Sequence, residues 1–218
     1  MRGARLKLKL LSDRIEDYLA KSEIIDFDDE QICSLADELY QSAADETDFI
    51  RKAYEFVRDE IQHSADAGKD EITLKASDVL KKKHGVCFAK SHLLAALLRN
   101  KHVPCGLCYQ KLVLDDDDAP VLILHGLNAV FLREYQKWVR LDARGNKTGV
   151  NAQFSVEKEQ LAFPVRSEKG EKDFSEVFAE PDTNVTGCLL RHKSRAALWN
   201  DLPAELSIEA AACCRAEK

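Results

Sequence analysis

Cys87 has the clearest chemical potential of any residue in this sequence. It lies in segment 84–101, where a Gly-Val-Cys step leads into a strongly apolar pattern with helical spacing. We therefore expect Cys87 at or next to a helix N-terminus, where the first backbone amides lack intrahelical partners and the helix dipole is positive. Such a position favours the thiolate, which is the nucleophilic form of cysteine. A cysteine nucleophile also needs a base, and the base needs a group that orients it.

His125 and Asp142 could fill these two roles. His125 lies within the second of three predicted strands, and Asp142 lies at the end of the third. If these strands pair, the two side chains lie side by side and face the N-terminus of the Cys87 helix. The imidazole would take the thiol proton, and the carboxylate would hold the imidazole in the right tautomer and stabilise its cation. Taken singly, His125 could instead be a buried strand histidine and Asp142 a turn cap, and that alternative stays open.

Two other histidines lie close to Cys87 in the sequence. His92 follows it by five residues, about 140° around a helix that turns roughly 100° per residue, so local geometry argues against His92 as the base. His84 precedes Cys87 and is a weaker rival to His125.

Helices are predicted through most of the first half of the chain, because apolar residues recur there at helical spacing. Asp28 or Asp29 could cap one of them and Asp45 another, and Thr73 or Ser77 could begin a short one that Gly85 ends. The predicted segments are 11–20, 32–40, 45–61, a short helix before residue 85, and the Cys87 helix, which stops before Pro104.

Beyond Pro104 the apolar pattern changes to the alternation of β-strands. The predicted strands are 105–114, 121–132 and 137–144, with an acidic turn at 115–120. Strands joined by such short connections pair antiparallel. The chain is therefore expected to be α+β, with N-terminal helices and the nucleophile helix packed on a small antiparallel sheet. A last short helix is predicted over 194–200.

Composition bounds the class of protein. The chain has 218 residues, 45% hydrophobic and 32% charged, with a net charge of −6. This is ordinary for a soluble globular protein, and the acidic balance argues against a nucleic-acid partner. No apolar run approaches the roughly 20 residues that span a membrane, so no membrane partner is expected. Charged residues soon interrupt the apolar N-terminus, which therefore lacks a signal-peptide core, and we expect a cytoplasmic protein.

The seven cysteines are scattered and odd in number, which is typical of reduced thiols in a cytosolic protein. Cys105 and Cys108 form a Cys-x-x-Cys pair, but a zinc or redox site would need a second ligand pair or a thioredoxin-type turn. The adjacent acids of 115–118 lack the ligand spacing of a calcium loop. We expect packing thiols and a solvated turn, and no metal or cofactor.

Taken together, these motifs resemble the transglutaminase-like superfamily of papain-like cysteine enzymes, in particular bacterial transglutaminase-like cysteine proteases. The resemblance spans a core of roughly 45–154 and extends to 161–165. Its motifs lie at 53–61, 75–99, 103–112, 124–132 and 138–155. On this basis we expect a single domain with a catalytic core at 45–165, an N-terminal helical extension at 1–44 and a C-terminal extension at 166–218.

The resemblance implies Cys87 as nucleophile, His125 as general base and acid, and Asp142 as the orienting carboxylate. The backbone N–H of Cys87 is a candidate oxyanion donor because a helix N-terminal amide faces developing negative charge. Relatives often have an aromatic residue where this chain has 62–64, which leaves the second donor open; Gln62 is a candidate because papain-like enzymes use a glutamine. Tyr109 and Gln110 are expected on a strand that borders the substrate cleft, with ordinary sheet packing as the alternative.

The expected function is a cysteine-dependent amide hydrolase or acyltransferase that forms a thioester on Cys87. Its partner would be a peptide or protein amide, either a peptide bond or a glutamine side chain. Hydrolysis is favoured over cross-linking by family analogy alone. A non-catalytic peptide- or protein-binding module with the same fold is the alternative. A redox or metal protein that uses Cys105, Cys108 and the tail cysteines is a third hypothesis.

Overall fold

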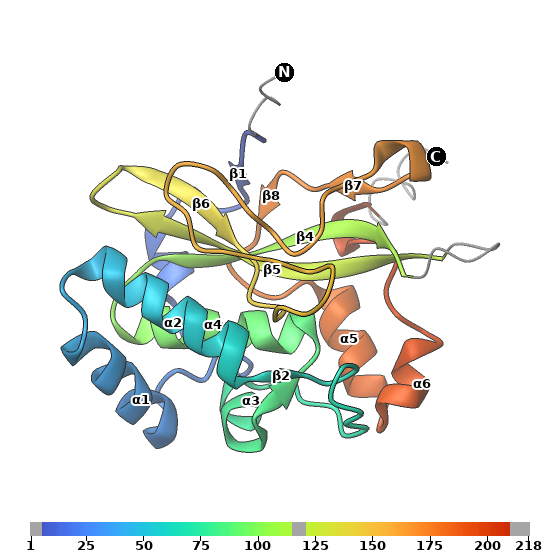
Figure 1. Ribbon diagram of the computed structural model, residues 1–218, viewed down its shortest axis with the longest axis horizontal. Helices are drawn as coiled ribbons and strands as arrows, with labels where there is room; N and C mark the ends of the chain where they lie inside the picture. The colour runs from blue at the N-terminus through green and yellow to red at the C-terminus, as the bar shows by residue number, and fades with distance from the viewer. Residues whose placement is uncertain (1–5, 115–120, 210–218) are drawn as a thin grey trace.

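The computed structural model describes residues 6–114 and 121–209 (Figure 1). Its helices α1 to α4 lie on one side of a small sheet, which confirms the expected α+β class. The predicted acidic turn at 115–120 and the tail residues Cys213 and Cys214 lie outside the described residues.

Capping aspartates begin the first two α-helices as expected. Asp29 caps α1 (Glu30–Gln41), since its side chain accepts hydrogen bonds from the first-turn amides. Asp45 caps α2 (Glu46–Glu60) in the same way. Both helices bury one apolar face against the core, which is the outcome that their spacing predicts.

Two predicted helices have different bounds in the structure. Segment 11–20 forms only a short 3-10 helix, η1 (Ile15–Leu19). Helix α3 (Ala76–Lys82) starts after Lys75, so neither Thr73 nor Ser77 begins it. It also ends early, because Lys83 adopts the left-handed conformation with φ 57°.

Gly85 therefore does not end a helix; it belongs to the two-residue strand β3 (His84–Gly85). Strand β3 pairs in parallel with β2 (Gln62–His63), and neither strand was predicted. This small sheet fixes the backbone on both sides of the position where α4 begins.

The three predicted strands form the sheet that faces the helices. They are β4 (Cys105–Val113), β5 (Leu122–Leu132) and β6 (Lys137–Leu141), and all pair antiparallel as expected. A short strand, β7 (Lys172–Asp173), completes the order β6-β5-β4-β7. Strand β6 pairs only with residues 128–132 of β5, so the edge of β5 around His125 is not covered by β6.

The C-terminal part of the described chain returns to the sheet. Strand β8 (Glu176–Val177) pairs in parallel with β1 (Lys9–Leu10), and a short 3-10 helix, η2 (Ser167–Lys169), precedes β7. Helix α5 (Thr183–Arg191) was not predicted. Helix α6 (Arg195–Trp199) corresponds to the helix predicted over 194–200, and in the structure Ser194 is its N-cap.

Helix α4 (Cys87–Asn100) is the centre of the fold, and every residue from Phe88 to Arg99 is buried. It packs against α1, α2, α3 and the sheet, as Figure 1 shows. Asn128 of β5 donates through Nδ2 to the carbonyl of Ser91 on α4 at 2.9 Å, which fixes the helix against the strand. None of the described helices is both long enough and apolar enough to cross a membrane.

Gly126 lets the first turn of α4 approach β5. A Cβ at this position would lie 2.6 Å from Cδ1 and 3.2 Å from Cα of Phe88, closer than atoms pack. Any larger residue would therefore push α4 away from the strand, beside both Cys87 and His125.

We predict that Gly126→Ala lowers the free energy of unfolding by about 1–3 kcal/mol, the usual cost of overpacking a filled core. Chemical denaturation measures the change. Gly187→Ala is the matched control, because its Cβ in α5 would meet only the Arg191 guanidinium at 3.6 Å and should be neutral or stabilising. Equal effects of the two substitutions would contradict the close contact as the cause.

Candidate active site

Cys87 is the first residue of α4, as the sequence predicted. Val86, in an extended conformation, is its N-cap, and neither a capping side chain nor an acidic residue occupies the first turn. The free amides and the positive end of the helix dipole are therefore available to a negative charge. The N–H of Gly126 points at the Cys87 Sγ at 3.5 Å. The backbone thus surrounds this sulfur with hydrogen-bond donors.

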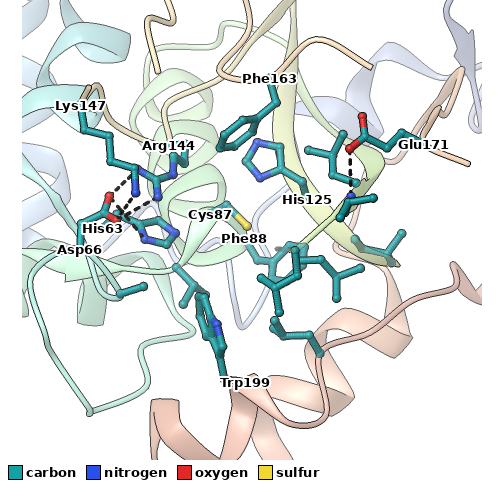
Figure 2. Close-up of a pocket in the computed structure, with 18 of the residues that line it drawn as sticks. His63, Asp66, Cys87, Phe88, His125, Arg144, Lys147, Phe163, Glu171 and Trp199 are labelled. Atoms are coloured by element: carbon teal, nitrogen blue, oxygen red, sulfur yellow. Dashed lines mark hydrogen bonds and ion pairs between the residues drawn. The ribbon is translucent and has the colours of Figure 1, made fainter. Parts of the chain in front are cut away.

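His125 and Asp142 lie beside Cys87, although they come from separate strands. The Nε2 of His125 is 2.9 Å from Oδ2 of Asp142, and both side chains are almost fully buried. The same imidazole contacts the Cys87 side chain, and Figure 2 shows the sulfur next to the His125 ring. The three side chains therefore form one chain of contacts, with the imidazole in the middle.

The charges of its neighbours favour the cationic form of His125. Burial alone would lower the pKa of this imidazole, but the charge of Asp142 and the interactions with Cys87 outweigh it and raise the pKa to about 10. A cationic imidazole beside a cysteine sulfur is placed to give a proton to a leaving group.

Backbone amides keep Asp142 ionised. Its Oδ1 accepts from the N–H of Arg144 and its Oδ2 from the N–H of Ala162, each at 3.1 Å. Burial would raise the pKa of this carboxyl, but His125 and the two amides lower it below its ordinary value. From the same loop as Ala162, Phe163 packs edge-on against the His125 ring, with centroids 5.3 Å apart.

A cavity of about 530 Å³ opens onto Cys87, His125 and Phe163. On one side of Cys87, a polar wall is formed by His63, Asp66, Arg144 and Lys147 (Figure 2). Apolar side chains form much of the rest. The remaining lining includes Val86, Phe88, Leu112, Ile123, Leu124, Phe163, Arg166, Glu171, Trp199 and Leu202.

Asp66 organises the polar wall. Both of its oxygens accept from the Arg144 guanidinium, and Oδ1 also accepts from Lys147 at 2.8 Å. Burial works against the charge of Asp66, but these hydrogen bonds hold the pKa of the carboxyl below its ordinary value. The wall therefore places two cations and one anion at this end of the cavity.

His63 is a cavity residue that the sequence did not single out. Its side chain is 8% exposed, its Nδ1 lies 4.0 Å from Oδ2 of Asp66, and this nitrogen has no hydrogen-bond partner among the described residues. Burial, aided by the charge of Arg144, lowers the pKa of His63 to about 3, so the ring is neutral at physiological pH. In β2, Gln62 is exposed and His63 is buried. This alternation follows from the pairing of β2 with β3, which the local sequence does not indicate.

Lys90 connects helix α4 to the segment that carries Asp142. This lysine is fully buried, and its Nζ donates to the backbone carbonyls of Arg58, Ile61 and Arg144. Burial lowers the pKa of Lys90 to about 7. One side chain thus ties α4 to the end of α2 and to the loop after β6.

Three residues expected near the substrate lie outside the cavity. Gln62 is exposed on β2 and does not line it. Tyr109 is buried beneath the sheet, where its hydroxyl accepts from the N–H of Asp182 at 2.9 Å. Gln110 is paired with His125 in register, but its buried side chain donates to Asp173 at 2.8 Å. Tyr109 and Gln110 therefore have the sheet-packing role that was the alternative.

The other histidines near Cys87 are held elsewhere. His84 shares a hydrogen bond with the Ser64 hydroxyl at 3.0 Å, and His92 shares one with the Leu74 carbonyl at 2.9 Å. Neither lines the cavity, so the structure favours His125 over His84 as the partner of Cys87.

Cys105 and Cys108 point to different parts of the molecule. Cys105 lies in the main core, whereas Cys108 lies in the cluster around Tyr18, as residues three apart on a strand should. Burial raises the pKa of both thiols. The pair therefore does not form a shared metal or redox site.

Another cysteine, Cys188, does lie near a histidine and an aspartate, His192 and Asp201, with candidate ligand atoms within 4.8 Å of one another. These groups already bond one another. The Cys188 thiol donates to the Asp201 carbonyl, while His192 and Arg191 both contact the Asp201 carboxylate.

A protein-family comparison agrees with this geometry. The model of the transglutaminase-like superfamily matches residues 33–143, about half of the chain, from α1 to just beyond Asp142. The chain belongs to the transglutaminase-like superfamily. The resemblance and the fold class predicted from the sequence are thereby confirmed.

Solved structures extend the likeness. A candidate cysteine protease from Cytophaga hutchinsonii aligns with a TM-score of 0.50 and 18% identity over 62% of this chain and 43% of its own. At that identity the match shows a shared fold alone. The periplasmic domain of TgpA from Pseudomonas aeruginosa aligns less closely, with a TM-score of 0.42 and 18% identity over 58% of this chain and 45% of its own. The chain thus spans less than half the length of either structure, and no curated protein sequence matches it significantly.

We predict that Lys90→Met lowers the free energy of unfolding by about 3 kcal/mol, because several buried carbonyls lose their donor and each such loss costs about 1–3 kcal/mol. Denaturant titration measures the change. Lys101→Met is the control, since Lys101 lies past the end of α4 with an exposed partner, Asp37. A Lys90 variant as stable as the control would refute the linking role.

We predict that Asp142→Asn lowers the pKa of His125 from about 10 towards its ordinary value near 6.5, because the amide cannot stabilise the cation. The stability that comes from the raised pKa of His125 is complete below about pH 6.5 and is lost as the pH rises towards 10; the variant should lose this dependence. NMR titration of the imidazole and denaturation across this pH range measure both effects. An unchanged His125 titration would contradict the ion pair.

Proposed function

We propose that this protein is a cysteine-dependent amide hydrolase in which Cys87 is the nucleophile, His125 the general base and acid, and Asp142 the orienting carboxylate. The observation that carries the proposal is one arrangement: the sulfur of a cysteine at a helix N-terminus lies beside the His125 imidazole and raises its pKa, and the Nε2 of that imidazole bonds a buried carboxylate. Superfamily membership supports a cysteine-dependent hydrolase or transglutaminase-like activity at the coarse level.

In the first half-reaction the Cys87 sulfur attacks the amide carbonyl carbon. The carbonyl π electrons move to oxygen, and the backbone N–H of Cys87, at the helix N-terminus, would stabilise that oxyanion. When the intermediate collapses, the C–N bond breaks and the His125 imidazolium gives its proton to the leaving amine. A thioester on Cys87 remains.

In the second half-reaction a water molecule attacks the thioester. His125, now neutral, takes the proton of the attacking water, and Asp142 stabilises the resulting imidazolium. The C–S bond breaks, the carboxylic acid leaves and the thiolate–imidazolium pair is restored. An amine in place of water would give a transamidated product by the same steps. The substrate class is therefore a peptide or protein amide, and a glutamine side chain is the variant that an amine acceptor would use.

We predict that iodoacetamide alkylates Cys87 at neutral pH faster than the other cysteines, since it combines partial exposure with the helix N-terminus and a base. Peptide mapping with mass spectrometry measures the rates. Cys33 is the internal control, because it is also half-buried but lies within α1. Equal labelling of Cys87 and Cys33 would contradict an activated nucleophile.

We predict that Cys87→Ala abolishes amide turnover, while Cys33→Ala retains it and Asp142→Asn reduces it by about 10²–10⁴-fold. The assay follows peptides and glutamine-containing peptides, with and without a primary amine, by mass spectrometry. Products that contain water or the amine separate hydrolysis from transamidation. If wild type and Cys87→Ala were both inert yet bound peptide equally, the fold would be acting as a binding module.

A further inference from the structure

Part of the cavity wall comes from the C-terminal part of the chain. Trp199, the last residue of α6, and Leu202, just beyond it, line the same cavity as Cys87, and Figure 2 shows Trp199 extending towards it. Both residues lie outside 33–143, the part that matches the superfamily model. This wall is therefore an addition of this chain to the matched core.

The C-terminal wall is fixed to the sheet beside the site. The N–H of Leu124, next to His125 on β5, donates to the Pro203 carbonyl at 2.7 Å. Asn184 of α5 donates to the Glu205 carbonyl at 3.0 Å. Asp182, 2% exposed at the start of α5, accepts from the backbone and the hydroxyl of Ser207. The segment that directly follows Leu202 is thus held to β5 and α5 by hydrogen bonds within the protein.

The cavity has an apolar end. The wall meets apolar side chains from β4, β5 and the first turn of α4, of which Leu112, Ile123 and Phe88 are examples. The carboxylate in this region, Glu171, is 2% exposed and is occupied by the Arg166 guanidinium and by the Arg166 and Val113 amides. A ligand at this end therefore meets mainly apolar surface, in contrast to the polar wall around Asp66.

We propose that this apolar end is a specificity subsite that receives a large apolar side chain, of the leucine or phenylalanine class, next to the reacting carbonyl of a peptide substrate. The inference rests on the proposed function, because it places the scissile amide at Cys87. A buried apolar side chain removes water from both surfaces, whereas a charged one would lose its hydration where the charges of Arg166 and Glu171 already pair with each other. Discrimination of about 10–200-fold is the range that an apolar pocket supplies.

Substitution of Leu202 tests the subsite by activity. Unlabelled hexapeptides that differ only at the two positions flanking the cleaved bond are compared by kcat/KM. We expect wild type to favour leucine or phenylalanine over serine or aspartate by at least about 10-fold at one of these positions. Leu202→Phe, which fills the space, should shift the preference to alanine, and Leu202→Ser should reduce it. Leu190→Ala, at a 70% exposed residue outside the cavity, should leave it unchanged.

A binding experiment keeps the subsite testable without turnover. In Cys87→Ser, Trp199 fluorescence and calorimetry follow the binding of the same hexapeptides. Tighter binding of leucine or phenylalanine peptides that Leu202→Phe abolishes would support the subsite even if no peptide is cleaved, in which case only the proposed function fails. Cleavage or binding that ignores side-chain polarity, or a preference that Leu202→Phe does not alter, would overturn the subsite and leave the nucleophile assignment intact.

Discussion

The close approach of the first turn of α4 to strand β5 is the contact on which the rest of the site depends. Gly126 permits it, because a side chain there would collide with Phe88. The approach brings the Cys87 sulfur to the N–H of Gly126 and to the imidazole of the preceding residue. The N-terminus of α4, with its unpaired backbone amides, and the N–H of Gly126 on β5 thereby face one sulfur atom.

Two buried basic side chains, Lys90 and Arg99, hold α4 in this position. Lys90, one turn after Cys87, donates to the carbonyl of Arg58 on α2, to that of Ile61 and to that of Arg144 in the loop after Asp142. Arg99, near the other end, donates to the carbonyls of Ala20, Cys105 and Ala179. These carbonyl oxygens satisfy donors that burial has removed from water. The helix is thus held near both ends by lysine and arginine, residue types that in most proteins lie on the surface.

Electrostatics divides the cavity into parts with different chemistry. Asp142 and Cys87 raise the pKa of His125, whereas burial and nearby cations lower that of His63, so the two imidazoles near one sulfur hold different charges. The Arg166–Glu171 pair is neutral, the groups around Asp66 carry one more cation than anion, and the apolar wall with Trp199 adds no charge. A substrate would meet a cationic proton donor, a polar wall and an apolar wall around a single nucleophile.

The sequence by itself determined the elements with strong local signals. Periodicity and capping aspartates predicted α1, α2 and α4 and the three main strands, and the spacing of Cys87, His125 and Asp142 made them one hypothesis, because residues on adjacent strands and at a helix start must converge in such a fold. Only the tertiary structure decided which neighbours point inward. His63 replaced Gln62 in the cavity through a two-residue strand pair, and Trp199 and Leu202 reached it from over a hundred residues beyond Cys87. Long-range pairing and burial of this kind depend on the packed surface, and local sequence does not encode that surface.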